Sequence, residues 1–407
     1  MEFQFKIPDR KFWREKVLSE LKEHKDRIIY KNEIEEIEFD ITEIPTNLIE
    51  NQDERDSNEW RNCFYVTVSN EDEANKLCLN ALMSGADSLF LDIAKSQTDW
   101  TKLFQGIGFE YISTRIRTSD SNEINSLDKY LKNNEIKNVF LLIDPLVNDN
   151  SFQKDHVLFL NGFELNQIGA NASQELGILL SSFHELLLKD CGSHKFNFHL
   201  GIGSNYFIEI AKFRAIKWLV KNLCYIYNIE SPEIVFTAET GFLNKSLKDP
   251  HTNLLRQSTE AMSAILGGVA ELTIRSYDDI SESGSNEFSR RMALNVSSIL
   301  KEESYFDYVN DPLKGSNLVN LLTEKIIEKS WQYFQKLENF GSINSQDKLN
   351  FIRESIEKIR TNRIDKFESN ENQLIGINCF KNKDEKLALW NTDKKYLGKS
   401  YLILEKN

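Results

Sequence analysis

The sequence predicts an α/β protein built on a (β/α)8 TIM barrel, with an N-terminal arm and a C-terminal helical extension. Short apolar segments alternate with long amphipathic segments about seven or eight times over roughly 250 residues. Apolar runs of this kind are typical of parallel strands buried on both faces. The number of repeats and their total length fit a closed eight-unit barrel better than an open doubly wound sheet.

The first 55 residues differ from this pattern, because they are charged and mixed in character. Residues 13–27 have apolar side chains at helical spacing, and residues 32–44 alternate like an edge strand. This segment has little apolar material with which to form its own core. We therefore interpret it as an arm that packs against another surface.

The alternating region begins with a predicted helix at residues 71–86. The predicted strands are 88–93, 109–116, 138–145, 157–162, 196–203, 233–239 and 270–277. The helices predicted after them are 97–108, 121–134, 171–190, 205–227, 250–268 and 286–304. We expect strands and helices in this order to form the barrel.

Two strongly periodic helices, 317–341 and 345–365, follow the alternating region, and residues 399–407 are strand-like. We therefore divide the chain into three parts by their patterns. These are an arm (1–55), a barrel (56–345) and a C-terminal helical and extended segment (346–407).

Composition and charge exclude several classes of function. The net charge of −13 argues against a nucleic-acid partner, since phosphate binding needs a basic surface. We find neither an apolar leader nor a stretch that could span a bilayer, which indicates a cytoplasmic protein without membrane contact. The five cysteines are scattered and lack metal-ligand spacing, so we expect reduced thiols and no metal site.

Several local motifs could carry chemistry, but each also has a structural explanation. Asp249-Pro250-His251 could hold a metal or a cofactor, although Asp249 also fits the N-cap of the next helix. The GIGSN segment, 201–205, offers a ligand loop, but Tyr206 breaks the dinucleotide fingerprint. The six histidines do not form the pattern of a catalytic triad.

The end of the last predicted strand leaves two interpretations open. Gly267-Gly268 is typical of a helix C-cap just before that strand. The segment 275–279, Arg-Ser-Tyr-Asp-Asp, lies at the carboxyl end, where barrel enzymes bind their ligands. These residues either contact a substrate or form a solvated loop with local ion pairs.

Four stretches of the sequence resemble the barrel of the methylmalonyl-CoA mutase family. They are NGFELNQIGANASQELGILL, FHLGIGSNYFIEIAKFRA, DPHTNLLRQSTEAMSAILGGVAELTIRSYDD and ALNVSSILKEESYFDYVNDPLKGSNLVNLLTEKI. They occur in the family's order and cover about residues 155–345, with a weaker extension toward residue 380. Members rearrange an acyl-CoA thioester with adenosylcobalamin, and the resemblance implies that fold and that substrate class.

The resemblance fails at the positions that carry the family's chemistry. The family's Tyr-His pair is Phe163 and Glu164 here, so an anion replaces a neutral imidazole donor. The family's Arg clamp for the substrate carboxylate has no counterpart in residues 117–156. Losing such a charge-assisted clamp would leave the carboxylate unpaired.

Two later motifs are also altered. The family's His-x-Gln pair is Thr237 and Glu239 in this chain, and its His-Thr-Asn segment is 273–275. The resemblance also stops before the family's cobalamin-binding domain, so we expect no such domain here. The retained residues are mainly turn glycines, a helix cap and helix ion pairs, all of which maintain a scaffold.

We therefore hypothesise that this chain is the small, non-catalytic subunit of a heteromeric mutase that interconverts methylmalonyl-CoA and succinyl-CoA. We expect no catalytic residue and no bound cofactor in it; its heterodimer partner, a large catalytic subunit, would hold adenosylcobalamin. Acyl-CoA is a further candidate ligand. Degenerate ligand-site positions are Asn166, Gly201, Gly203, Asn205, Thr237, Glu239, Arg275 and Asp279. The alternative is a catalytic acyl-CoA mutase barrel that works with a separately encoded cobalamin-binding subunit.

Overall fold

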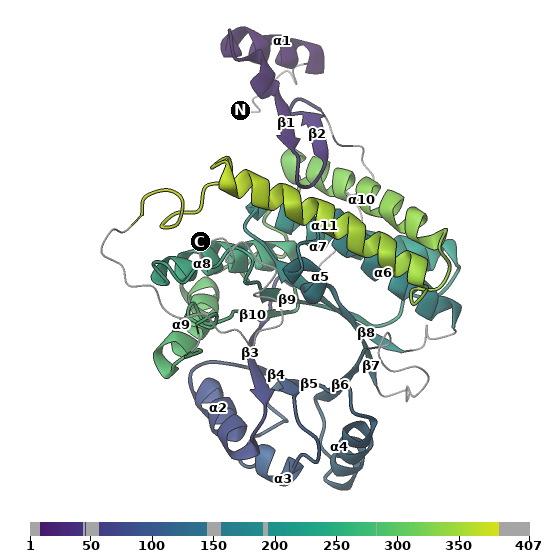
Figure 1. Ribbon diagram of the computed structural model, residues 1–407, viewed down its shortest axis with the longest axis vertical. Helices are drawn as coiled ribbons and strands as arrows, with labels where there is room; N and C mark the ends of the chain where they lie inside the picture. Colours follow the sequence, from purple (N-terminus) through teal and green to yellow (C-terminus); the bar gives the residue numbers. More distant parts are fainter. Residues whose placement is uncertain are drawn as a thin grey trace, which may run out of the picture.

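The computed structural model describes residues 9–43, 45, 57–144, 156–189, 194–281 and 283–381. Its centre is a closed barrel of parallel strands in the order β10-β3-β4-β5-β6-β7-β8-β9 (Figure 1). The strands are β3 (Arg61–Val68), β4 (Ser88–Ile93), β5 (Ser113–Arg117), β6 (Val139–Ile143), β7 (Val157–Asn161), β8 (Lys195–Ile202), β9 (Ile234–Thr240) and β10 (Glu271–Thr273). The predicted (β/α)8 fold is thus confirmed.

The position of the first strand corrects the sequence prediction. We predicted that the alternation starts with the helix at residue 71, but β3 precedes that helix and closes the barrel against β10. Its sequence, RNCFYVTV, is rich in β-branched and aromatic residues, a signal that the search for repeats from residue 71 overlooked. At the other end, β10 stops at Thr273 instead of continuing to residue 277.

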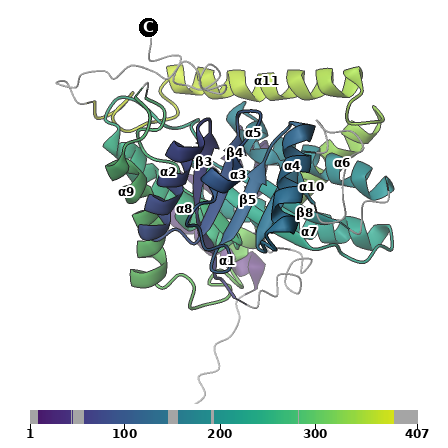
Figure 2. The same cartoon turned by 90° about the horizontal axis from the view of Figure 1, so that it is seen from below.

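The helices of the barrel lie outside the strands (Figures 1 and 2). They are α2 (Glu71–Met83), α3 (Trp100–Leu103), α4 (Ser121–Asn133), α5 (Gly162–Gln167), α6 (Ala172–Leu188), α7 (Tyr206–Ile226), α8 (His251–Gly267) and α9 (Glu287–Ser298). α3 is a single turn rather than the predicted helix 97–108, and the short α5 was not predicted. α9 continues into a π-helical turn, Ile299–Glu303.

The two ends of α8 test the capping predictions. Gly268 ends the helix in the left-handed region, with φ of 79°, which confirms the glycine C-cap. The N-cap prediction was wrong, because Pro250 occupies that position and Asp249 precedes it with φ of 46°. The backbone carbonyl of Asp249 accepts the helix-start hydrogen bond from the Thr252 N–H, at 2.9 Å.

The principal core lies between the outer face of the barrel and its helices. Alternate residues of β8 point outward, and Phe196, Phe198 and Leu200 pack with Phe183 of α6 and Phe213 of α7. The intervening residues of β8 face the barrel axis, as a period of two requires. The wall of the barrel therefore has an apolar outer layer, and the side chains that face the axis can be polar or charged.

The N-terminal segment contains α1 (Arg10–Leu21), a 3-10 turn (Lys25–Ile28) and a hairpin of β1 (Ile29–Asn32) and β2 (Ile37–Asp40). Ile37 and Phe39 of the hairpin are buried in the principal core. The Glu35 carboxylate accepts the Ala172 N–H at 2.8 Å, at the first turn of α6. The hairpin is therefore packed against the barrel, while no residue of α1 is buried.

Two long helices, α10 (Asn317–Glu338) and α11 (Gln346–Glu368), complete the described chain. α10 packs against α6 and α7, and α11 lies across the C-terminal end of the barrel (Figure 2). Lys366 of α11 forms an ion pair with Glu33 of the hairpin, with 2.6 Å between Nζ and Oε2. The predicted strand at 399–407 lies outside the described residues. Among the helices within the described ranges, none is long and apolar enough to cross a membrane.

A buried charge cluster joins β8 to the helices on either side of it. The Lys212 ammonium lies 2.9 Å from a Glu175 oxygen and 2.7 Å from a Glu209 oxygen. It also donates to the Gly201 carbonyl at 2.6 Å, and Glu175 accepts the Gly201 N–H at 3.2 Å. Burial raises the pKa of Glu175 to about 7, against the opposing effect of Lys212.

Replacing Lys212 with methionine should destabilise the protein strongly, because two carboxyl groups would remain buried without their cation. We expect Lys212→Met to lower the free energy of unfolding by about 3–5 kcal/mol. Urea unfolding followed by circular dichroism measures this loss. Lys358→Met on the exposed face of α11 is the matched control, and it should change stability by less than about 0.5 kcal/mol. Equal effects of the two substitutions would show that the buried charge of Lys212 does not stabilise the fold.

Candidate functional site

The structure separates the eight candidate positions into two groups. Glu239, Arg275 and Asp279 line a cavity at the C-terminal mouth of the barrel, and Thr237 lies one layer beneath them. The second group lies around the end of β8, under α11: Asn166, Gly203 and Asn205 line another cavity there, and Gly201 lies against Asn166. The substituted pair, Phe163 and Glu164, faces the mouth cavity.

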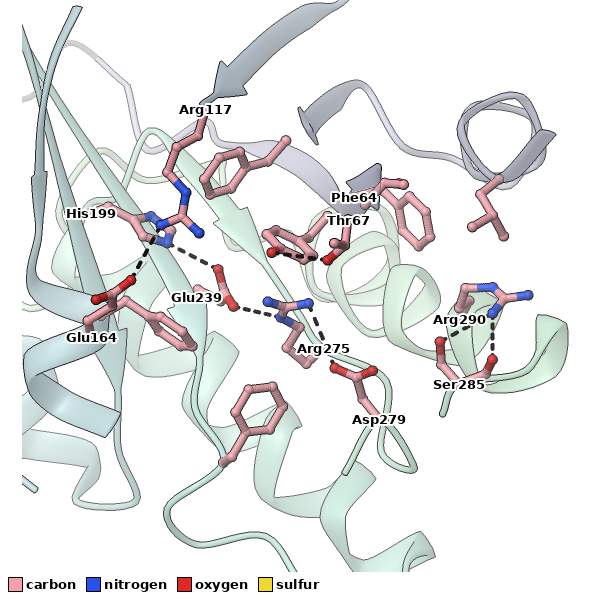
Figure 3. Close-up of a pocket in the computed structure, with 16 residues that line it drawn as sticks. Phe64, Thr67, Arg117, Glu164, His199, Glu239, Arg275, Asp279, Ser285 and Arg290 are labelled. Atoms are coloured by element: carbon pink, nitrogen blue, oxygen red, sulfur yellow. Dashed lines mark hydrogen bonds and ion pairs between the residues drawn. The ribbon is translucent and has the colours of Figure 1, made fainter. Parts of the chain in front are cut away.

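The mouth cavity has a volume of about 300 Å³ and a mixed aromatic and charged lining (Figure 3). Inward-facing residues of several strands form its floor and walls. They are Tyr65 and Thr67 of β3, Phe90 of β4, Arg117 of β5, His199 of β8 and Glu239 of β9. This position, at the carboxyl ends of the strands, is where a barrel holds its ligands.

Arg275 occupies the centre of the mouth and is held from several sides. Its Nε donates to the Glu239 carboxylate at 2.6 Å, and its Nη1 lies 3.7 Å from an Asp279 oxygen. Its guanidinium stacks on the Tyr65 ring at 3.6 Å from the ring centroid. Arg275 and Asp279 thus form the local ion pair that the loop interpretation predicted, although both side chains are largely buried rather than solvated.

Arg117 forms a second paired cation on the opposite wall. Its Nε and Nη2 donate to the two oxygens of Asp92 at 2.9 and 2.6 Å, a bidentate geometry. Asp92 also accepts the Tyr65 hydroxyl at 2.7 Å. Glu164 lies 3.7 Å from Arg117 Nη1 and is the most exposed of the mouth carboxylates that form ion pairs.

His199 connects the mouth to the layer below. Its Nε2 lies 3.1 Å from the Glu239 carboxylate, which can only accept, so Nε2 carries the proton. Its Nδ1 then accepts the Thr237 hydroxyl at 2.9 Å. Burial lowers the pKa of His199 below 6.5, although Glu239 opposes this shift, and the imidazole is neutral at pH 7.

The neighbouring Arg275 and His199 side chains fix the charge of Glu239. Burial by itself would raise the pKa of this carboxyl group. The Arg275 guanidinium and the His199 hydrogen bond outweigh burial and lower the pKa of Glu239 to about 2. Glu239 is therefore ionised and committed to two partners, which leaves it unsuited to act as a general base.

Side chains fill the barrel axis beneath the mouth. Arg115 lies there, fully enclosed, and forms an ion pair with Glu271 at the base of the barrel. Its Nη1 also donates to Asn197 at 3.1 Å and to Thr237 at 3.2 Å, and its guanidinium lies 4.6 Å from the Phe90 ring centroid. The described interior is thus a packed polar core rather than an open channel.

The second group of candidate residues has mainly structural contacts. The Asn205 side chain caps α7 by accepting the Ile208 N–H at 3.4 Å. Gly201 is required by close packing, since a Cβ there would lie 2.5 Å from the Asn166 Cβ. Beside these residues is a cavity of about 420 Å³ between the hairpin, α7 and α11.

Sequence reasoning missed several residues of the mouth network, namely Tyr65, Asp92, Arg115, Arg117 and His199. A signal existed for the arginines, because alternate residues of a predicted strand share one face and Arg115 and Arg117 are two apart. An inward arginine in a barrel strand needs an internal carboxylate, and the partner strands could not be matched from sequence. Among the described residues, no cluster of three or more His, Cys, Asp or Glu could hold a metal ion.

Comparison with known proteins gives a consistent match. A family model described as methylmalonyl-CoA mutase matches residues 149–402. The methylmalonyl-CoA mutase small subunit of Porphyromonas gingivalis is 37% identical over 238 residues, which cover 56% of this chain and 38% of that protein. The methylmalonyl-CoA mutase of Rhizobium meliloti is 28% identical over 243 residues, which cover 57% of this chain and 34% of that protein.

A protein named as a large subunit also matches. The methylmalonyl-CoA mutase large subunit of Propionibacterium freudenreichii subsp. shermanii is 26% identical over 233 residues, with 54% of this chain and 32% of that protein covered. The chain thus spans between about a third and two-fifths of the length of these curated relatives.

Stability should fall on acidification, and Glu239 should account for a defined part of the fall. Its pKa is about 2 in the folded protein against 4.5 in the unfolded chain, so its contribution is present above pH 4.5 and lost toward pH 2. His199 acts in the same direction from about pH 6.5 downward, because its folded pKa is lowered. We expect Glu239→Gln to cost about 3 kcal/mol at neutral pH, a difference that narrows below pH 4.5.

Urea unfolding of both proteins between about pH 7 and about pH 3 measures this difference. The matched control is Glu357→Gln, which removes an exposed carboxylate from α11. A stability difference for Glu239→Gln that stays constant across this range would show that the charge of Glu239 is not responsible.

Proposed function

This chain belongs to the methylmalonyl-CoA mutase family, and we propose that it is the small, non-catalytic subunit of a heteromeric methylmalonyl-CoA mutase. In this proposal the complex interconverts methylmalonyl-CoA and succinyl-CoA with adenosylcobalamin, and this chain stabilises the assembly. The observation that carries the proposal is the mouth of the barrel, where the chain's own ion pairs fill the position of a substrate.

The chemistry of the mouth supports a non-catalytic role. Glu164 stands where the resemblance places a histidine, and it brings a negative charge toward any bound thioester or carboxylate. The two arginines that could clamp a carboxylate, Arg117 and Arg275, already bind Asp92 and Glu239. A substrate carboxylate would have to displace these internal partners.

The packed axis argues against a bound acyl-CoA. The ion pair of Arg115 with Glu271 and the aromatic side chains of Phe90 and Phe159 occupy the centre of the barrel. All four residues are nearly inaccessible to solvent. A chain as long as the pantetheine arm could enter the barrel only if this core were displaced.

The residues present do not fit adenosylcobalamin either. The mouth cavity, of about 300 Å³, is small for a corrin, and the ion pair of Arg117 with Glu164 lies at its rim. The Asp249-x-His251 segment begins α8, where the His251 ring packs on Tyr277 at 5.1 Å between centroids. We therefore assign the cofactor to the partner chain and no radical step to this one.

The N-terminal arm offers a contact for the partner. α1 presents Phe12 and Trp13, whose exposed fractions are 63% and 51%, and no residue of this helix is buried. Arg14 of this helix forms an ion pair with Asp40 at 2.8 Å, which holds the helix to the hairpin. We propose that this apolar face packs against the large subunit.

The isolated chain should neither turn over methylmalonyl-CoA with added adenosylcobalamin nor bind an acyl-CoA. Activity assays and calorimetry with succinyl-CoA test the two statements. The complex reconstituted from this chain and a large subunit is the positive control. Turnover by this chain together with a separate cobalamin-binding protein would instead establish the alternative, a catalytic acyl-CoA mutase barrel.

Replacing Phe12 and Trp13 together with serine should weaken the complex without unfolding the barrel. We expect the affinity for the large subunit to fall about tenfold or more, because two buried aromatic anchors are lost. Co-elution in size-exclusion chromatography and surface plasmon resonance measure this effect. Tyr111→Ser, at an exposed position on the barrel, is the control. Deletion of residues 1–50 should also weaken the complex, although it removes Ile37 and Phe39 from the principal core as well. Unchanged affinity in the double variant would contradict the proposal.

A further inference from the structure

The barrel wall has a short seam between its last and first strands. β10 pairs with β3 over only three residues, and the final pair is Thr273 with Cys63. β3 continues to Val68, but the chain beyond Thr273 turns toward β9, where the Arg275 N–H donates to Thr240 at 2.9 Å. Within the part of the chain that the structure describes, residues 64–68 of β3 therefore have no strand partner on this side.

The mouth cavity extends through this seam to the outside of the barrel. Its lining includes Tyr65 and Thr67, which face the axis, and Phe64 and Val66, which face outward. A second cavity of about 350 Å³ lies outside, between α2 and α9. The two cavities share Phe64, Leu77 and Arg290, so we treat them as one passage and call the outer part the α2–α9 groove.

The α2–α9 groove combines an apolar floor with cations at its edge. Phe64, Leu77, Ala81 and Leu294 form the floor. Arg290 and Arg291 of α9 line one side together with Glu287, and Asp278 is close enough for the Arg290 charge to act on it. The Arg290 guanidinium is held by the Ser285 carbonyl at 2.6 Å and hydroxyl at 3.2 Å (Figure 3).

The charges decide how a ligand would lie in this passage. Glu164, Glu239 and Asp279 line the inner part of the mouth against Arg117 and Arg275, and Arg117 is already paired with Asp92, so this part carries an excess of negative charge. An anionic group is therefore repelled from the inner mouth and attracted to the seam, where Arg290 lies. An aliphatic chain attached to it finds apolar contacts only outward, along the α2–α9 groove.

We propose that the α2–α9 groove binds a monoanionic amphiphile, a carboxylate on an aliphatic chain, with its head at Arg290 and its tail over Phe64 and Leu77. The guanidinium, already oriented by Ser285, offers its remaining N–H groups to the carboxylate. The chain displaces water from the half-buried floor of the groove. This site lies outside the barrel, and the proposal holds whether or not the chain is a mutase subunit.

Isothermal titration calorimetry with octanoate tests the site in the full chain. Acetate has the same head without the tail, and octanol has the tail without the charge. We expect each to bind about tenfold or more weakly than octanoate, because each loses one of the two interactions. Binding of acetate as tight as that of octanoate would mean an adventitious anion site and would overturn the proposal, as would the absence of octanoate binding.

Two variants locate the binding. Arg290→Met keeps the aliphatic stem and removes the charge, and Ser84→Trp fills the groove from the end of α2. Each should weaken octanoate binding about tenfold or more, while Arg353→Met, an exposed charge loss on α11, should leave it unchanged. Circular dichroism confirms that each variant is folded. Wild-type affinity in either groove variant would refute the site, and tighter binding of an acidic peptide than of octanoate would assign the groove to a polypeptide.

Discussion

Lys212 is buried in the wall of the barrel, and the arrangement of three neighbouring elements depends on its charge. It belongs to α7, and its ammonium group reaches Glu175 of α6 and the backbone of Gly201 in β8. Neither Glu175 nor Glu209, the second carboxylate beside Lys212, could remain buried as an ion without this cation. Gly201 is also where β8 must approach Asn166 too closely for a side chain. The cluster therefore fixes the register of two helices on the strand that carries His199 into the barrel.

Inside the barrel, other buried cations are also paired with carboxylates. Arg115, Arg117 and Arg275 each meet a carboxylate from a neighbouring part of the wall, and aromatic rings cover their guanidinium planes. The interior is consequently polar with its charges paired, and His199 and Thr237 link one layer to the next. Such a core stabilises the barrel, and both mouth arginines, Arg117 and Arg275, are paired within it. The passage through the seam is different, because Arg290 lines the α2–α9 groove, where the Ser285 carbonyl and hydroxyl hold its guanidinium.

The order of the strands and helices could be predicted from the local sequence pattern. Each error in their predicted bounds has a physical cause. β8 and α7 were predicted within a residue or two, because a strongly apolar strand precedes a helix with a continuous 3.6-residue period. β3 was overlooked because it precedes the repeating region, and the last predicted strand was too long because Ile274 and Arg275 leave the sheet at the seam. The predicted cap at Asp249 gave way to Pro250, since the chain enters α8 through a left-handed residue.

The sequence by itself determined the barrel and its family, and it predicted that Phe163 and Glu164 replace the family's Tyr-His pair, because apolar periods and motifs are properties of contiguous residues. Only the tertiary structure decided which charges neutralise one another. Glu239 and Arg275 are 36 residues apart, and Arg115 and Glu271 are separated by most of the barrel, yet the closed sheet brings each pair into contact. Ion pairing depends on distance in space and on burial, and neither quantity exists until the strands close into a barrel.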